Sequence, residues 1–311
     1  MYAAIEIVFP VFSIMIAGWC FVRFGLMGRK GLKGITNYVF LLAIPALLFR
    51  TMANGAVDGN VDWSLIYAYY SAAAINFVLA HIIGWKILVV PPDQRAVMGI
   101  SATFSNGVLI GLPLVQLAYG QKGLVPLLLL ISVHALILIT IATLSLEISR
   151  GSGDRWYKIL FQSSKGVLTN PIVVSLIAGL AWYHTGWQLP VVVDRFCEIL
   201  GTGAGPAALF AVGSSMAYIK LQGDLRHIAL LTGMKLLLLP LWVWIMMVFV
   251  FDVREDWIKI AVIMAALPIG ANASLFAQRY EVYEDRATGA VFLSTVLSIV
   301  TLTIFIGFID I

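Results

Sequence analysis

Charged side chains are scarce in this sequence, since only 12% of its 311 residues are Asp, Glu, Lys or Arg while 61% are hydrophobic. A water-soluble domain carries about 25% charge, so the composition excludes an ordinary soluble fold. The net charge of +4 does not indicate nucleic-acid binding, because the cations lie in short patches between apolar runs. We therefore read the charges as markers of membrane topology.

Cysteine is also rare, and basic residues are missing from the N-terminal region. Cys20 and Cys197 are expected near opposite membrane faces, too far apart to form a disulfide. No Lys or Arg precedes Arg23, and the first apolar run exceeds the ~7 to 15 residues of a signal-peptide core. The first segment is expected to be a permanent membrane span.

Common hydrolase motifs are absent. The sequence has no His-Glu-x-x-His, no Gly-x-Ser-x-Gly and no pair of carboxylates within an apolar run. An intramembrane enzyme is therefore excluded, and no cofactor is expected. The absence of a mid-span Asp also argues against a carboxylate-driven sodium/proton antiporter.

Long apolar runs, bounded by charge, Gly or Pro, fill most of the chain. Each run must be helical, because lipid offers the backbone no hydrogen-bond partner and the runs are too long for barrel strands. The sequence thus predicts an all-α integral membrane protein with ten transmembrane helices. Spans one to ten are expected at 4–22, 35–53, 63–90, 96–119, 124–146, 166–187, 196–219, 228–251, 257–278 and 287–309.

Lys and Arg are unevenly distributed between the two sets of loops. The loops after the odd-numbered spans hold fourteen of them, whereas the opposite face, with both termini, holds five. Basic loops stay in the cytoplasm, so both termini are expected outside, in a bacterial plasma membrane. Membrane lipid is expected to surround these spans.

The two halves of the chain share a pattern at one offset of 161 residues. This offset makes the following pairs: Pro10 with Pro171, Gly25 with Gly186, Pro45 with Pro206, and Tyr119 with Tyr280. We interpret 1–155 and 156–311 as duplicated halves, although apolar sequences also resemble one another by composition alone. Five spans per half would turn the second copy upside down, and inverted repeats are typical of transporters.

The fourth span of each half is interrupted by Gly, Pro and Asn near its middle. The segments are Ser101–Pro113 and Ala265–Phe276, and the 161 offset places Gly107 on Pro268. Proline and glycine disfavour a continuous helix, so both helices are expected to break at the same depth. Half-helix N-termini carry partial positive charge that suits an anion. Ordinary proline kinks are the alternative.

The candidate substrate-binding residues cluster at these breaks, with two more on neighbouring spans. They are Ser105, Asn106, Gly107, Pro268, Asn272, Ser274, His134 and Asn76. His134 could bond substrate, titrate during transport or simply pack against a neighbouring helix. Lys235 is expected to extend toward the inner face, with a substrate role as the alternative.

Three stretches carry a family resemblance over the whole chain. Phe104–Leu114, Thr169–Pro171 and Ala266–Ala277 resemble the auxin efflux carrier family, whose members include plant auxin exporters and bacterial relatives assigned to malonate or malate. The resemblance implies a ten-helix inverted-repeat fold with crossed spans four and nine. It also implies elevator-type motion of a core (spans three to five and eight to ten) against a scaffold (spans one, two, six and seven), and a homodimer.

The resemblance makes Asn106 a ligand for the substrate carboxylate. Ser105 and Ile269 stand where plant members carry Pro and Gln, and the interval 64–85 lacks the Asp and Lys of the plant span three. Auxin itself is therefore doubtful, and a mono- or dicarboxylate such as malonate, malate or an auxin-like acid is expected. Sodium or proton coupling stays open, and a ligand-binding membrane sensor is the alternative function.

Overall fold

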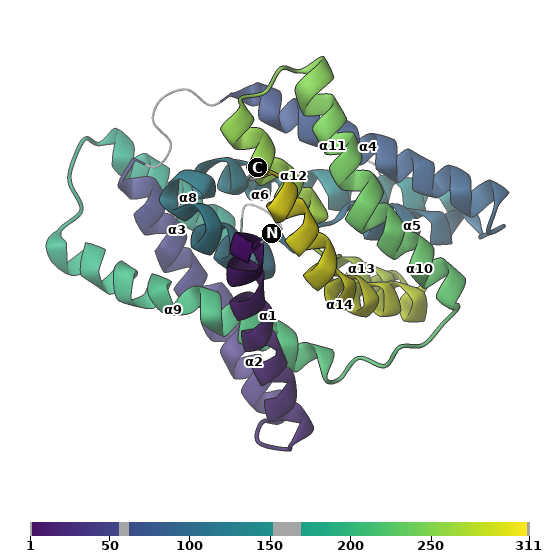
Figure 1. Cartoon of the computed structure of the whole chain (residues 1–311), viewed down its shortest axis with the longest axis horizontal. Coiled ribbons are helices and arrows are strands. Elements are labelled where there is room, and N and C mark those ends of the chain that lie inside the picture. Colours follow the sequence, from purple (N-terminus) through teal and green to yellow (C-terminus); the bar gives the residue numbers. More distant parts are fainter. Residues whose placement is uncertain (1, 56–61, 152–168, 310–311) are drawn as a thin grey trace.

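The computed structural model describes residues 2–55, 62–151 and 169–309. In these ranges the chain is built of helices, and its only strand-like pairing is one isolated bridge. Seven helices are long and apolar enough to cross a membrane. The predicted all-α membrane class is thus confirmed for the described part of the chain, whose helices pack side by side (Figure 1).

The first half of the chain begins with rods that match the expected spans. They are α1 (Tyr2–Arg23), α2 (Arg29–Tyr38) continuing through a π-helical turn, Val39–Ala43, into α3 (Ile44–Ala53), and α4 (Trp63–Lys86). A broken rod follows: α5 (Pro92–Thr103), a π-helical turn, Gly107–Gly111, and α6 (Leu112–Ser149). α6 turns at Gly120, whose φ of 60° favours glycine, and this turn divides expected spans four and five.

The second half repeats this order. Its helices are α8 (Pro171–His184), α9 (Val191–Met216), α10 (Leu225–Gly233), α11 (Leu239–Ile245), α12 (Glu255–Ala266), α13 (Ala271–Tyr280) and α14 (Glu284–Ile309). π-helical turns at Met234–Leu238 and Met246–Val250 make α10 and α11 one rod. α12 ends before Pro268 because proline cannot continue the helix and holds Leu267 extended, with ψ at 152°.

Left-handed backbone recurs at matching places in the two halves. Six of the ten described residues with positive φ form three pairs: Gly25 with Gly186, Val89 with Asp252, and Gly120 with Glu281. The first and third pairs lie at the 161 offset, and the second lies two residues from it. Chain reversals of the same kind therefore recur at or near this spacing.

The helices pack in two groups. α1 lies along α9, and α3 packs against α8 and α9, on the lower and left side of Figure 1. On the right side, α4 packs against α5 and α11, and α10 packs against α14. Within the first group, a Cβ atom at Gly213 would overlap the Met15 carbonyl, and one at Gly18 would overlap that of Phe210. Glycine thus brings the α1 and α9 backbones into direct contact.

Candidate functional site

The two broken helices meet at their breaks. Ser105 lies opposite Ile269 in an antiparallel bridge. The Asn106 N–H donates to Pro268 O at 3.0 Å, and the Gly270 N–H donates to Phe104 O at 2.9 Å. Two extended segments from distant parts of the sequence therefore cross and are joined by backbone hydrogen bonds.

The pairing at the crossing is antiparallel, with Phe104 facing Gly270 and Asn106 facing Pro268. The 161 offset related Gly107 to Pro268 as equivalent positions of two halves and not as contacts, and that equivalence stays a prediction. Gly107 lies in the first turn after its break.

The outward N–H groups of the bridge are bound by side chains of the following helices. The Ser105 N–H donates to His134 Nε2 on α6 at 3.0 Å, and the Ile269 N–H donates to Ser294 Oγ on α14 at 3.1 Å. Each break is therefore supported from the next helix along the chain. No pattern in the sequence indicated this role of Ser294.

The hydrogen bonds of His134 determine which of its nitrogens carries the proton. Tyr70 O–H donates to Leu130 O at 2.8 Å, so the Tyr70 oxygen is left to accept from His134 Nδ1 at 3.2 Å. Nε2 must then be unprotonated, because it accepts from Ser105 N–H. The structure thus holds a neutral His134 bonded to neighbouring elements, and this histidine also lines a cavity.

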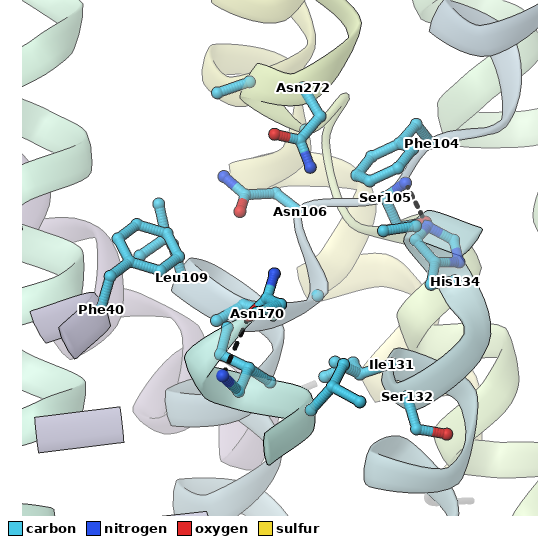
Figure 2. A pocket seen from close by; sticks show the side chains of 17 residues that line it. Phe40, Phe104, Ser105, Asn106, Leu109, Ile131, Ser132, His134, Asn170 and Asn272 are labelled. Carbon is cyan, nitrogen blue, oxygen red and sulfur yellow. Dashed lines mark hydrogen bonds between the residues drawn. The ribbon is translucent and has the colours of Figure 1, made fainter. Parts of the chain in front are cut away.

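A cavity of about 180 Å³ lies beside the crossing. Among its lining residues, the polar ones are Ser105, Asn106, Ser132, His134, Asn170 and Asn272. None of the described residues that line it is Asp, Glu, Lys or Arg. Figure 2 shows the asparagines of three separate elements around the same opening, with His134 at its side.

Three helix N-termini meet at this cavity. The turn starting at Gly107, α13 starting at Ala271, and α8 starting at Pro171 each contribute lining residues from their first turn or cap. The first N–H groups of a helix have no partner within it, and the helix dipole adds partial positive charge there. An anion is the ligand that such a meeting point favours.

Asn170 is a lining residue that sequence reasoning missed. Its Oδ1 accepts from the Ile172 N–H at 2.9 Å and caps α8, so its amide nitrogen remains as a donor (Figure 2). Asn before Pro at a helix start is a readable capping pattern, and Thr169–Pro171 was recognised only as part of a resemblance. Phe40, Ser132 and Ile172 line the cavity without any sequence signal.

The predicted residues divide into two sets. Ser105, Asn106, Gly107, His134 and Asn272 line the cavity. The other three do not: Pro268 serves the bridge through its carbonyl, the Ser274 hydroxyl donates to Ala271 O at 2.9 Å, and the buried Asn76 amide donates to Ala102 O at 2.8 Å. These three are neighbours of the site in sequence or packing.

Lys235 does not extend to the inner face, so that expectation is wrong. Its side chain is fully buried, and Nζ donates to Ala265 O at 2.5 Å and to Leu267 O at 2.6 Å. These carbonyls close the C-terminal end of α12, where cations are stabilised by the helix dipole. At the buried position the two carbonyls accept the hydrogen bonds that water would accept at the membrane surface.

Apolar spanning helices and two broken helices around a polar cavity define an integral membrane transporter. The chain belongs to the membrane transport protein family, which includes the auxin efflux carriers, and the match covers residues 3–306. The family resemblance seen in the sequence is thereby confirmed. The relatives named as transporters also indicate a transporter rather than an enzyme.

Three relatives illustrate the range of the family. A "Putative malonate transporter" of Rhizobium meliloti is 24% identical over 96% of this chain and 93% of its own length. The auxin efflux carrier component 8 of Arabidopsis thaliana is 26% identical over 43% of this chain and 38% of its own. The lysosomal cholesterol signaling protein of Mus musculus is 26% identical over 92% of this chain but only 35% of its own length.

Proposed function

We propose that this protein is a secondary transporter that carries a small organic anion across the membrane by alternating access. The observation that carries the proposal is the cavity at the crossing, where three helix N-termini and three asparagines surround a space with no acidic side chain among its described lining residues. Amide and backbone N–H groups beside such a space bind a carboxylate through charge-assisted hydrogen bonds. Asn106 and Asn272 are the proposed ligands from the two breaks, and Asn170 is a third.

The substrate class follows from these donors and from the relatives. Amide and backbone donors recognise a carboxylate group but do not require an aromatic ring. We infer a mono- or dicarboxylate, with malonate first because it appears in the name of the rhizobial relative, then malate or an auxin-like acid. The coupling ion, sodium or proton, is left to the flux measurement.

A ten-span inverted repeat is the architecture we propose for this activity, with halves 1–155 and 156–311. The three pairs of left-handed residues support it. So do the reciprocal hydrogen bonds between the breaks, which map onto each other when the two halves are exchanged. The matching supports of Ser105 by His134 and of Ile269 by Ser294 add a third argument.

Elevator-type motion is the proposed form of alternating access. The packing of α1 with α9 and of α3 with α8 and α9 fits a scaffold of spans one, two, six and seven. The packing of α4 with α5 and α11, and of α10 with α14, fits a moving core. Glycine-mediated contact between α1 and α9 would keep that scaffold pair rigid.

The proposed topology has both termini outside a bacterial plasma membrane, with lipid around the apolar helices and a homodimer as the assembly. Contacts between helix ends support the grouping of the loops. Arg50 binds Asp194 at 2.8 Å, and Arg150 donates to Tyr280 O at 3.1 Å. Each contact joins ends that the basic-residue count had placed on one face.

Flux of labelled malonate, malate and indole acetate into proteoliposomes, with and without sodium or pH gradients, tests the proposal. Asn106→Ala removes a proposed ligand, and Asn37→Ala on the exposed face of α2 is the matched control. A lost hydrogen bond to a charged group should lower affinity roughly 10- to 100-fold. Saturable flux lost only in Asn106→Ala supports transport, whereas equal flux in both variants contradicts the assignment.

A ligand-binding membrane sensor is the second candidate. The mouse relative favours it, because the region similar to this chain is only 35% of a longer protein named for signaling. A sensor would bind an anion in the Asn106 cavity without net flux. Saturable binding together with no flux, in the same folded preparation, distinguishes this reading from transport.

A further inference from the structure

Lys235 is the only fully buried Asp, Glu, Lys or Arg side chain in the described part of the chain. None of the described acidic side chains is within ion-pair distance of its amino group. Its contacts are the carbonyls of Ala265 and Leu267. A buried ammonium without a carboxylate partner is costly, so its presence calls for a compensating charge.

The end of α12 compensates this charge only in part. A helix C-terminus carries about half a negative elementary charge, and carbonyl oxygens are neutral dipoles. An ammonium group at Lys235 would therefore leave a net positive charge behind the break. An anion bound in the adjoining cavity would supply the balancing negative charge.

The path from Lys235 to the cavity is short. Leu267, which accepts from Nζ, directly precedes Pro268, and the Pro268 carbonyl accepts from the N–H of Asn106, which lines the cavity. Two peptide units and two hydrogen bonds place the amino group on the order of 10 Å from a bound carboxylate. Lys235 itself does not line the cavity.

We propose that Lys235 carries the positive charge that makes the Asn106 cavity selective for anions, acting across the break without touching the substrate. This inference rests on the proposed function and identifies the electrostatic determinant of its substrate class. Lys235 is thus a specificity-determining residue, while the asparagines and helix N-termini supply the contacts.

The size of the effect follows from Coulomb's law. At an effective dielectric of about 20, unit charges about 10 Å apart attract strongly enough to change an affinity roughly 15-fold. A dianion should gain roughly the square of that factor, about 200-fold, whereas a neutral molecule should gain nothing. A merely structural cap would not distinguish ligands by charge.

The test compares Lys235→Gln with wild type, because glutamine removes the charge and keeps an N–H donor for the α12 carbonyls on a slightly shorter side chain. The probes are malonate, malonamate and malonamide, which have nearly the same shape and carry two, one and no negative charges at pH 7.5. Calorimetry in detergent micelles measures their affinities. We expect Lys235→Gln to weaken malonate far more than malonamate, and to leave any malonamide binding unchanged.

An equal loss of affinity for malonate and malonamate in Lys235→Gln would overturn the inference. Lys235 would then only cap the end of α12. If wild-type protein binds none of the probes and transports no other carboxylate, the proposed function fails, and the inference fails with it. The two failures are therefore distinguishable by the wild-type measurement.

A charge exchange keeps the inference testable if Lys235→Gln does not fold. Asn76 caps the end of α5 through Ala102 O, two residues before Phe104, which pairs with Gly270. The double variant Asn76→Lys with Lys235→Asn moves the charge to the other half-helix end, at a similar distance from the crossing. We expect it to retain the preference for malonate over malonamate; loss of that preference in the folded double variant would contradict a through-space role.

Discussion

Asn76 and Lys235 perform the same structural task at the ends of two different half-helices. The Asn76 amide donates to Ala102 O at the end of α5, and the Lys235 amino group donates to Ala265 O at the end of α12. Both donors come from the helix preceding the broken one. The C-terminal ends of α5 and α12 are thus capped in a similar way, by a neutral donor in one case and by a lysine in the other. Variants of Asn76 and Lys235 can therefore be compared directly.

Asn76→Ala is expected to destabilise the protein without changing its discrimination between anions. The change leaves Ala102 O without this donor in a buried position, which costs about 1 to 3 kcal/mol. Thermal unfolding in detergent measures the loss, and the malonate-to-malonamate affinity ratio should stay at the wild-type value. A changed ratio would mean that the neutral cap also contributes to charge selection.

His134→Gln is expected to preserve the break, whereas His134→Leu is not. Glutamine has one acceptor for the Ser105 N–H and one donor for the Tyr70 oxygen, as the neutral histidine does. Leucine leaves the buried Ser105 N–H unpaired, at a cost of about 1 to 3 kcal/mol. Thermal unfolding of both variants checks this difference.

The same pair of variants tests whether His134 transfers a coupled proton. Because Nε2 accepts from Ser105 N–H, no site for a second proton is open on His134 in this state. Flux in His134→Gln should therefore respond to an imposed pH gradient as wild type does. A response present in wild type and lost in a folded His134→Gln would assign the proton to this residue.

Gly213→Val is expected to disrupt the pairing of α1 with α9. Any side chain there overlaps the Met15 carbonyl, and overpacking costs about 1 to 3 kcal/mol or more when backbone is the obstacle. Gly34→Val, at a helical glycine with open space around it, is the control. The midpoint temperature of thermal unfolding should fall for Gly213→Val only. Equal midpoints for the two variants would mean that α1 and α9 separate easily.

Cysteines at Val108 and Ala271 are expected to change accessibility with transport state. Both residues line the cavity, from the two sides of the crossing. In a background without Cys20 and Cys197, labelling by a membrane-impermeant thiol reagent should differ with and without substrate at both positions. Constant labelling in active protein would indicate that the breaks are static kinks.

Local chemistry made the breaks predictable from the sequence, but not their contacts. Gly107, Pro268 and the nearby asparagines disfavour a continuous helix wherever they lie, so the interruption could be located. The pairing of Ser105 with Ile269 depends on how two distant segments cross, and no local pattern in either segment specifies it.

Lys235 shows that the depth of a residue along a helix does not determine where its side chain ends. Its distance from the span end suggested that the side chain could reach the inner face, and that argument assumed that nothing closer would accept its protons. The end of α12 offers two carbonyls beside it, and this proximity exists only in the folded protein. Asn170 is a different case, because its capping pattern was visible and its position at the cavity was not.

The crossing is held by N–H and C=O groups that every residue except proline possesses in full. A substitution at Ser105 or Ile269 therefore leaves these two backbone hydrogen bonds possible, provided that Asn106 and Gly270 keep their amide hydrogens. Relatives whose side chains differ at the crossing can thus keep the same pair of backbone hydrogen bonds.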